Sequence, residues 1–488
     1  MDLFWHPYKY YPYEFEFARR EIEALVSPKT VEKIRGGIRL SSPLRPEAVE
    51  RLVYFAATGP DSQPLLQARL ERVNGNGPNR QSTRYSAHGL HEYKGKFNPQ
   101  VPKAILNILA IPFGSRVLDP FCGSGTSLVE AVHLGMRATG TDINPLAVFL
   151  ANAKITSLKT DPDELRAAAK AVSRKKAVPK PSGDARETYL ASWFEPRILR
   201  EIERLRLTLS GLERGTATIL AACASNLLRE YSAQEPMDLR IRRRKTPLPE
   251  KPFADAFAEA VERFAFRTER AQEVLGKTGS GQALLLDSRE LTPDSPGIDC
   301  RFDCALTSPP YATALPYIDT QRLSLVWLGL IHPEEILPLE ARLVGSRESR
   351  GAERRELTKL LESNGASLPR AQVSYCMKLL NSLGESDGFR RKAVPGLLYR
   401  YFAGMAASFR GVRSVMRDGS PYALVVGGNH TVLGGRRFDI DTPAHLASLA
   451  EANGWRTREI LPLQTYQRYG LHMNNAVANE ALVILEAA

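Results

Sequence analysis

Short apolar runs, each ending at polar or turn-forming residues, alternate along this chain with longer segments of helical spacing. The apolar runs predict buried strands, and they cover residues 117–118, 136–141, 302–306, 421–429 and 480–485. Helical spacing is found at 13–25, at 45–57, at 127–134 and over most of 156–278, a stretch rich in Ala, Leu, Arg and Glu. The pattern therefore predicts strands and helices that follow one another along the chain.

The strand predicted at 302–306 leads into Thr307-Ser308-Pro309-Pro310-Tyr311. Two successive prolines fix φ at about −65° and remove two backbone donors, so the loop is stiff and keeps free carbonyl groups. Tyr311 adds a flat ring beside these acceptors. This combination suits a planar base with an exocyclic amino group, held by stacking and by hydrogen bonds from its amino hydrogens. The alternative is an ordinary proline turn with a core tyrosine.

A second strand, at 117–118, leads into Asp119-Pro120-Phe121-Cys122-Gly123-Ser124-Gly125-Thr126 and then into a helical run. Gly123 and Gly125 let the backbone approach a ligand closely, and the start of the helix offers free amide donors. The next strand ends in Asp142, which is suited to accept hydrogen bonds from ribose hydroxyls. Glycines in such turns also serve packing alone, but the acidic residue favours a nucleoside ligand.

These blocks resemble the DNA amino-methyltransferases, which transfer methyl from S-adenosylmethionine to an exocyclic nitrogen of cytosine or adenine. Residues 119–126 are similar to the family's cofactor loop, and residues 307–311 to its catalytic loop. Residues 91–100 (HEYKGKFNPQ) look like the segment that closes over the methionine part of the cofactor. Residues 284–290 are similar to the third strand, whose terminal acidic and small polar residues contact the adenine. Ser308 is similar to the N4-cytosine branch, because many adenine enzymes carry Asp or Asn there.

The resemblance implies an α/β fold with a Rossmann-like methyltransferase sheet, mostly parallel and of about seven strands, helical insertions and a small helical N-terminal domain. Residues 156–278 separate two strands that are neighbours in the family's sheet, so they must leave the core as an insertion. The expected parts are a helical N-terminal domain (1–81), three core segments (82–155, 279–330, 396–488), a helical insertion and candidate DNA-binding region (156–278), and a second insertion, a candidate for target recognition (331–395).

The implied activity is that of a site-specific DNA (cytosine-N4-specific) methyltransferase acting on a flipped base in double-stranded DNA. The implied cofactor is S-adenosyl-L-methionine, and no metal is implied. The alternatives are N6-adenine methylation, an RNA guanine amino-methyltransferase, which usually carries Asp in place of Ser308, and an inactive nucleic-acid-binding homologue. The recognition sequence, the oligomeric state and the existence of a cognate restriction endonuclease stay open.

The site residues follow from the matched motifs. The implied catalytic residues are Ser308, Pro309, Pro310 and Tyr311. The implied cofactor-binding residues are Lys96, Phe97, Asp119, Phe121, Gly123, Gly125, Thr126, Asp142, Ile143, Asp287 and Ser288.

The chemistry needs no covalent intermediate. If Ser308 and the carbonyl of Pro309 accept the two amino hydrogens, the nitrogen lone pair is localised and transfer is direct. Alignment of this kind can supply ~7–11 kcal/mol of the barrier. The chain lacks the Pro-Cys pair that C5-cytosine methyltransferases use, and we read Cys122 as a small residue that fills the cofactor turn.

The composition of the chain indicates what kind of partner and which compartment to expect. A net charge of +12 in 488 residues favours a polyanionic partner. Five cysteines without C-x-x-C spacing argue against a disulfide framework and favour a reducing compartment. The N-terminus lacks the pattern of a signal peptide, and no run approaches the ~20 apolar residues of a membrane span, so we expect a cytoplasmic protein.

Basic residues supply the candidate DNA contacts. The densest run is Arg240-Ile241-Arg242-Arg243-Arg244-Lys245, a candidate phosphate contact whose alternative is a solvated surface. A second set lies in 331–395 and comprises Arg342, Arg347, Arg350, Arg354, Arg355 and Lys359. Either insertion could therefore recognise the target.

A few further residues near the motifs are open to two interpretations. His91 contacts the cofactor or DNA, or it is a structural hydrogen-bonding histidine. Tyr317 and Asp319 line the base pocket, or Asp319 caps the next helix. We expect the polar residues 467–471 and 474–475 to face the substrate.

Overall fold

The computed structural model describes most of the chain. The described residues are 1–41, 45–59, 61–72, 81–175, 178–179, 181–238, 240–312, 318–349, 351–464 and 480–488.

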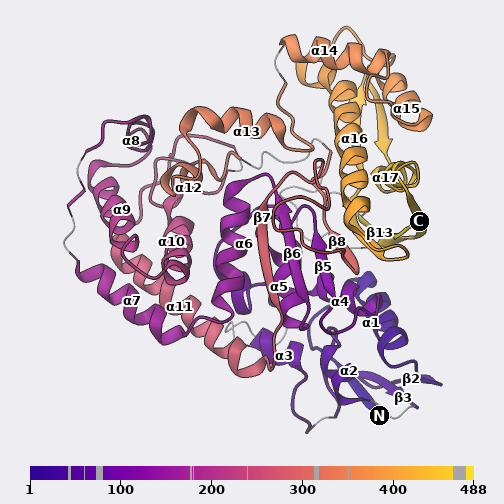
Figure 1. Ribbon diagram of the computed structural model, residues 1–488, viewed down its shortest axis with the longest axis horizontal. Helices are drawn as coiled ribbons and strands as arrows, with labels where there is room; N and C mark the ends of the chain where they lie inside the picture. Colours follow the sequence, from indigo (N-terminus) through magenta and orange to yellow (C-terminus); the bar gives the residue numbers. More distant parts are fainter. Residues whose placement is uncertain are drawn as a thin grey trace.

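Seven strands form the central sheet, in the order β12-β13-β9-β8-β5-β6-β7 (Figure 1). Their bounds are β5 (Arg116–Asp119), β6 (Arg137–Asp142), β7 (Ser280–Leu285), β8 (Cys304–Thr307), β9 (Pro421–Gly427), β12 (Trp455–Leu463) and β13 (Glu480–Ala487). Pairing is parallel from β7 to β9, and β13 alone runs opposite to its neighbours. The prediction of a mostly parallel seven-stranded sheet is confirmed.

The strand order reverses between β5 and β8, because the chain leaves β5 toward β6 and β7 and returns to β8 on the other side. In open α/β sheets a ligand binds at such a switch point, beyond the carboxyl ends of the strands. Both motifs singled out in the sequence begin there, since β5 ends at Asp119 and β8 at Thr307. Topology alone thus brings together two loops that lie nearly 190 residues apart.

Alternate strand residues face two layers of helices. Val117 and Cys304 belong to a core with α1 (Pro12–Leu25), α4 (Gln100–Ile108), α5 (Thr126–His133) and part of α6 (Pro145–Ser157). Leu118 and Ala305 face the opposite core, with α15 (Arg370–Leu380), α16 (Phe389–Val415) and α17 (Thr442–Glu451). Because both faces are covered, β8, β9 and β13 are almost entirely buried and apolar, as a buried sheet requires. Strands β6, β7 and β12 lie nearer the edges of the sheet and carry polar residues.

The N-terminal region is only partly helical. It holds α1, α2 (Pro46–Arg51), α3 (Leu66–Glu71) and an antiparallel sheet in the order β2-β3-β1-β4, with β1 (Asp2–Trp5), β2 (Val31–Ile34), β3 (Gly37–Leu40) and β4 (Phe55–Ala57). The helix expected at 45–57 was wrong in its second half. Phe55 pairs with Trp5 across β1 and β4, with ring centroids 4.3 Å apart, and local spacing cannot reveal such a partner.

The N-terminal region also shares its hydrophobic core with the central sheet. Leu3, Phe17 and Leu52 are fully buried in the same cluster as Val117. The region is therefore packed directly on the sheet, and it approaches the switch point through α1.

The first insertion is helical, as predicted. It contains α7 (Pro162–Arg174), α8 (Ala185–Ala191), α9 (Pro196–Leu209), α10 (Arg214–Leu228) and α11 (Phe253–Val274), which lie with α12 (Arg322–Trp327) beside the β7 edge of the sheet (Figure 1).

The second insertion projects beyond the sheet at the top of Figure 1. It contains α13 (Ile336–Arg342), α14 (Gly351–Glu362), α15 and the start of α16, and a hairpin of β10 (Asn429–Leu433) and β11 (Arg436–Ile440) follows β9. Within the described ranges, no helix is both long and apolar enough to cross a bilayer.

Candidate active site

A cavity of about 300 Å³ opens at the switch point. All four predicted catalytic residues line it, and so do Lys96, Phe97, Phe121, Gly123, Asp142, Ile143, Asp287 and Ser288 from the predicted cofactor set. Asp119, Gly125 and Thr126 do not line it. The structure therefore brings twelve of the fifteen predicted catalytic and cofactor residues to one cavity, whose volume is at the lower end for small-molecule sites.

The glycines of the cofactor loop are required by its backbone. Gly123 has φ +49°, and the ring of Tyr93 lies over it. Gly125 has φ +79° where α5 begins, and a Cβ there would lie 2.8 Å from Cβ of Ala151. Larger residues would thus strain the loop at both positions and displace α6 at the second.

Asp119 joins the two loops from behind the cavity. Its Oδ1 accepts a hydrogen bond from Oγ1 of Thr307 at 2.6 Å and another from the backbone N–H of Phe121 at 3.1 Å. Burial raises the pKa of Asp119 to about 6. The residue therefore fixes the catalytic loop relative to the cofactor loop, which is a positioning role rather than the direct contact predicted from the motif.

A buried lysine supports the same loop and was missed in the sequence. Nζ of Lys154, on α6, donates to the carbonyl of Ser124 at 2.8 Å and to its Oγ at 2.9 Å. Burial lowers the pKa of Lys154 well below its usual value. A lysine in a helical segment is ordinarily taken for a surface residue, so nothing local pointed to this contact.

Asp142 lies at the end of β6, and its carboxylate accepts hydrogen bonds from backbone N–H groups on both sides. Oδ2 accepts from the N–H of Gly123 at 2.9 Å, and Oδ1 accepts from the N–H of Asn144 at 2.8 Å. Burial raises the pKa of Asp142 to about 6. The side chain therefore shapes the cofactor turn and also faces the cavity.

Asp287 and Ser288 follow β7, and they differ in whether their side chains are hydrogen-bonded. Arg289 donates to both carboxylate oxygens of Asp287, and although burial opposes them these bonds hold the pKa of Asp287 below its ordinary value. Oγ of Ser288 is buried, lines the cavity and has no hydrogen-bond partner among the described residues. An orphaned buried hydroxyl of this kind fits a group whose partner is a ligand.

Residues 93–98 form one wall of the cavity. Burial, with a smaller effect from the charge of Arg84, lowers the pKa of Lys96 to about 8. His91 does not line the cavity and lies within hydrogen-bonding distance of the carbonyl of Glu92 (2.6 Å) and Oγ of Ser225 (3.3 Å). Of its two interpretations, the structure favours the structural histidine.

The catalytic loop is held from three directions. The hydroxyl of Tyr311 donates to Oε1 of Glu480 at 2.7 Å, and Nδ2 of Asn429 donates to the carbonyl of Ala312 at 2.7 Å. Gly345 lies so close that a Cβ there would be 2.7 Å from the carbonyl oxygen of Tyr311. In the described part of the chain, no donor is bonded to the hydroxyl of Ser308 or the carbonyl of Pro309.

Several cavity residues were not predicted to line it: Tyr13, Asn144, Arg289, Arg342, Leu343, Val344, Val425 and Glu480. Arg342 was expected only as a candidate DNA contact. Asn144 and Arg289 follow β6 and β7 next to predicted residues, whereas the others come from α1, from the second insertion and from the sheet's C-terminal strands, which only the folded topology brings to this cavity. Tyr317 and residues 467–471 and 474–475 lie outside the described residues. Asp319 does not cap α12, whose N-cap is Gln321; it pairs with Arg322 at 2.7 Å.

The basic run 240–245 lies outside the cavity, and some of its arginines are bonded to other residues of the chain. The guanidinium of Arg243 lies 4.3 Å from the Trp193 ring and donates to the carbonyl of Ser192. Arg244 donates to the carbonyl of Ser232, and Arg242 pairs with Asp238 at 3.0 Å. The run therefore includes arginines that hold the loop.

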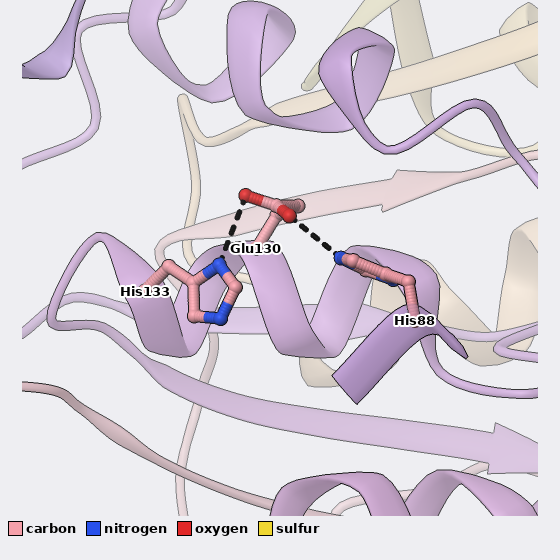
Figure 2. Close-up of side chains that lie close together, drawn as sticks. All are labelled: His88, Glu130 and His133. Carbon is pink, nitrogen blue, oxygen red and sulfur yellow. Dashed lines mark hydrogen bonds and ion pairs between the residues drawn. The ribbon is translucent and has the colours of Figure 1, made fainter. Parts of the chain in front are cut away.

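Figure 2 shows a cluster of three buried polar side chains, His88, Glu130 and His133. Glu130, on α5, is 2.7 Å from Nε2 of His88 and 3.3 Å from Nδ1 of His133, an arrangement with metal-ligand composition. Its carboxylate also accepts from the hydroxyl of Tyr85 at 2.8 Å and lies 3.5 Å from Nζ of Lys103. Because an ammonium already compensates this carboxylate, we read the cluster as a structural link between α5 and the segment before the cavity wall.

Sequence comparison identifies relatives of part of the chain. Residues 5–153 match the N6_N4_Mtase family, described as DNA methylase. Type II methyltransferase M.MvaI of Kocuria varians is 25% identical over 292 residues, 55% of this chain and 64% of that protein. Type II methyltransferase M.MjaII of Methanocaldococcus jannaschii is 41% identical over 68 residues, 14% of this chain and 13% of that protein. The tRNA (guanine(10)-N2)-dimethyltransferase of Methanothermobacter thermautotrophicus is 40% identical over 52 residues, 11% of this chain and 16% of that protein.

The chain thus spans less than two thirds of the length of each of these relatives. Among solved structures, TrmN from Thermus thermophilus aligns over 100% of this chain and 99% of that chain, at 12% identity and a TM-score of 0.34. That score is too low to support an argument, so the fold rests on the strand order given above. The cofactor implied by the family match is S-adenosylmethionine, and the orphaned Ser288 hydroxyl and the Gly123 turn, both at the cavity, fit a nucleoside ligand. By these matches, residues 5–153 carry the sequence features of the DNA methylase family, and the chain is similar over a longer stretch to a Type II methyltransferase.

Proposed function

We propose that this protein transfers a methyl group from S-adenosylmethionine to the exocyclic N4 of a cytosine flipped out of double-stranded DNA. One observation carries the proposal: the loop 308–311 and eight of the eleven residues predicted to hold the cofactor line the same cavity. A stiff loop with free acceptors beside a nucleoside site is what amino-group methylation needs. The match of residues 5–153 to the DNA methylase family supports the same reaction class.

The chain's own residues account for the activation of the amino group. Oγ of Ser308 and the carbonyl of Pro309 would accept hydrogen bonds from its two N–H groups, which localises the lone pair on nitrogen. As the new N–CH3 bond replaces the S–CH3 bond, the nitrogen gives up one of these protons to water. Tyr311 holds the base by stacking, and Glu480 fixes the orientation of the Tyr311 hydroxyl. When bound, S-adenosylmethionine supplies an electrophilic methyl group on its sulfonium sulfur. Asp142, Ser288 and Lys96 are the residues that would hold its ribose, adenine and carboxylate.

The base and the nucleic acid are the open parts of this proposal. Ser308 favours cytosine, with N6 of adenine as the alternative. The local identity with a tRNA (guanine(10)-N2)-dimethyltransferase favours RNA guanine as the second candidate substrate. A catalytically silent homologue is disfavoured because the loop and the cavity are both intact.

The test is to incubate the purified protein with methyl-labelled S-adenosylmethionine and either genomic DNA or tRNA, and to analyse the digested nucleosides by mass spectrometry. N4-methylcytosine in DNA is the expected product. N6-methyladenine would change the base, and methylated guanosine in tRNA would change the substrate. No labelled nucleoside from any substrate, with cofactor binding retained, would contradict the activity itself.

We expect the affinity for the cofactor to depend on pH because of Lys96. Its pKa of about 8 means that the ammonium is present below pH 8 and is lost above it. If it pairs with the cofactor carboxylate, affinity should fall about tenfold between pH 7 and pH 9. Calorimetry with S-adenosylhomocysteine, which carries the same carboxylate, measures this change. Lys96→Met should bind more weakly at pH 7 and lack this fall; an equal fall in both proteins would contradict the role.

For the basic run, we propose that Arg240 and Lys245 contact DNA phosphates. They are exposed, whereas Arg243 and Arg244 are tied to backbone carbonyls and would disturb the loop if removed. Arg240→Gln with Lys245→Gln should lower the salt dependence of DNA binding by roughly 0.9 for each phosphate that is no longer neutralised. The matched control is Lys29→Gln with Lys33→Gln, on the exposed N-terminal hairpin. Fluorescence anisotropy measures how the DNA affinity of each variant depends on salt. If the basic-run variant and the wild type have the same slope, the run is a solvated surface and does not contact DNA.

A further inference from the structure

A second basic site lies on the second insertion, where α14 meets the start of α16. The two helices touch through Arg354, whose Nη1 donates to the carbonyl of Phe389 at 3.2 Å. An open hollow forms between them and is lined by Gly351, Arg354, Arg355, Thr358, Lys359 and Lys392. Four of these six residues are cationic and none is acidic. We call this surface the α14 hollow.

The positive charge of the α14 hollow is only partly compensated. Lys359 pairs with Glu356 at 3.1 Å across an exposed face, while Lys392 donates to the carbonyl of Glu385. Glu353, the other nearby acid on this part of α14, is paired with Arg400. Within the described ranges, the exposed guanidinium of Arg355 has no hydrogen-bond or ion-pair partner. Four neighbouring cations with a single paired carboxylate, that of Glu356, repel one another, and a polyanion relieves that repulsion.

The spacing of these residues suits an extended anion rather than a single one. Arg355 and Lys359 are four residues apart and so lie along one face of α14. At 1.5 Å per residue their positions are about 6 Å apart along the helix. Successive phosphates of one DNA strand are about 3.4 Å apart along the axis, so these two cations reach more than one phosphate.

An exposed aromatic side chain adjoins the α14 hollow. Phe389 is 65% exposed and lies 5.5 Å from the guanidinium of Arg354 and 5.6 Å from that of Arg390. An aromatic ring flanked by arginines supplies apolar and cationic contact together, which is typical of nucleic-acid surfaces and not of a merely solvated charge run.

The same insertion reaches the catalytic loop. Arg342, Leu343 and Val344 line the active-site cavity, and Gly345 lies against the Tyr311 carbonyl. Helix α14 begins six residues further on, at Gly351. A contact at the hollow would therefore be only a few residues, along the chain, from residues 342–345, which line the cavity and lie against the catalytic loop.

We infer that the α14 hollow binds the phosphodiester backbone of double-stranded DNA while the target base occupies the catalytic cavity. This inference rests on the proposed function. It assigns α14 and the start of α16 to backbone contact, which carries affinity and register but no base information.

The test compares the salt dependence of binding to a labelled random-sequence DNA duplex, by fluorescence anisotropy, for the full chain and two charge-matched variants. Arg355→Gln, Lys359→Gln and Lys392→Gln together remove three exposed cations of the hollow. Lys29→Gln, Lys33→Gln and Arg35→Gln together remove three from the N-terminal hairpin, at the opposite end of the molecule in Figure 1. The hollow variant should bind at least about tenfold more weakly, with a slope lower by up to about 2.7, while the control keeps the wild-type slope.

An unchanged slope in the hollow variant overturns the inference, and so does an equal drop in both variants, which would reflect net charge alone. A larger loss of binding to an RNA duplex than to DNA overturns the assignment to DNA. S-adenosylhomocysteine affinity, measured by calorimetry, should not change, which excludes misfolding of the core as the cause. Methyl transfer by the wild type tests the proposed function separately. If the wild type transfers methyl groups but the hollow variant keeps the wild-type salt slope, the proposed function stands and only the role of the α14 hollow is rejected.

Discussion

Replacement of Tyr311 by alanine is expected to abolish most methyl transfer while the affinity for S-adenosylhomocysteine stays at the wild-type value. The ring lines the cavity beside the two prolines, on the opposite side of the switch point from Asp142 and Asp287. Loss of base stacking costs ~1–3 kcal/mol, which alone corresponds to about a 5- to 150-fold effect. Misalignment of the amino group adds to this loss, because Tyr311 also adjoins the acceptors at Ser308 and Pro309. Single-turnover assays on duplex DNA, with calorimetry for the cofactor, measure the two quantities separately.

Two further variants separate the ring from its hydroxyl. Tyr311→Phe keeps the stacking surface and removes the hydrogen bond to Glu480, so it should retain far more activity than the alanine variant. Glu480→Gln keeps an acceptor for the hydroxyl and should resemble the wild type more closely than Glu480→Ala does. Full activity in Tyr311→Ala, or equal losses in the alanine and phenylalanine variants, would contradict the stacking role.

The middle of the central sheet could be predicted because its strands are buried on both faces. Burial on both faces makes strands such as β8 and β13 continuous apolar runs, at 302–306 and 480–485, and such runs are visible without knowledge of their partners. The short strand β4 could not be predicted, since Phe55 is extended only because it pairs with Trp5, fifty residues away. Local spacing reports the periodicity of a segment, whereas pairing depends on where the rest of the chain lies.

The same distinction holds for the candidate site. Residues 119–126 and 307–311 carry their signal in adjacent glycines, prolines and an aromatic residue, so the sequence could single them out. Glu480 and Lys154 act through single contacts with residues far away in the chain, to Tyr311 and Ser124. Each looks locally like an ordinary polar residue of a strand or helix end. Residues that support a loop from a distance have no local signature, and only the fold reveals them.

Replacement of Asp142 by alanine is expected to weaken cofactor binding by about 100-fold. The carboxylate accepts the N–H groups of Gly123 and Asn144, and hydrogen bonds to a charged group are worth ~1.5–3 kcal/mol each. Alanine would leave both donors without that acceptor and would remove the candidate ribose contact. Asp142→Asn keeps one acceptor oxygen but turns an amide donor toward the second N–H, so its loss should be intermediate. Calorimetry gives the affinities, and thermal unfolding shows how much of the change is a loss of stability.

A change of ligand separates the ribose contact from support of the loop. If Asp142 bonds the ribose, the wild type should bind S-adenosylhomocysteine more tightly than its deoxyribose analogue, and Asp142→Ala should lose that preference. If Asp142 only shapes the turn at Gly123, both proteins should discriminate between the two ligands equally, and the ribose role would be wrong. The pH dependence offers a second check, because burial raises the pKa of Asp142 to about 6. A carboxylate that must be ionised to bind the ribose should lose cofactor affinity as the pH falls through 6, and Asp142→Ala should lack that loss.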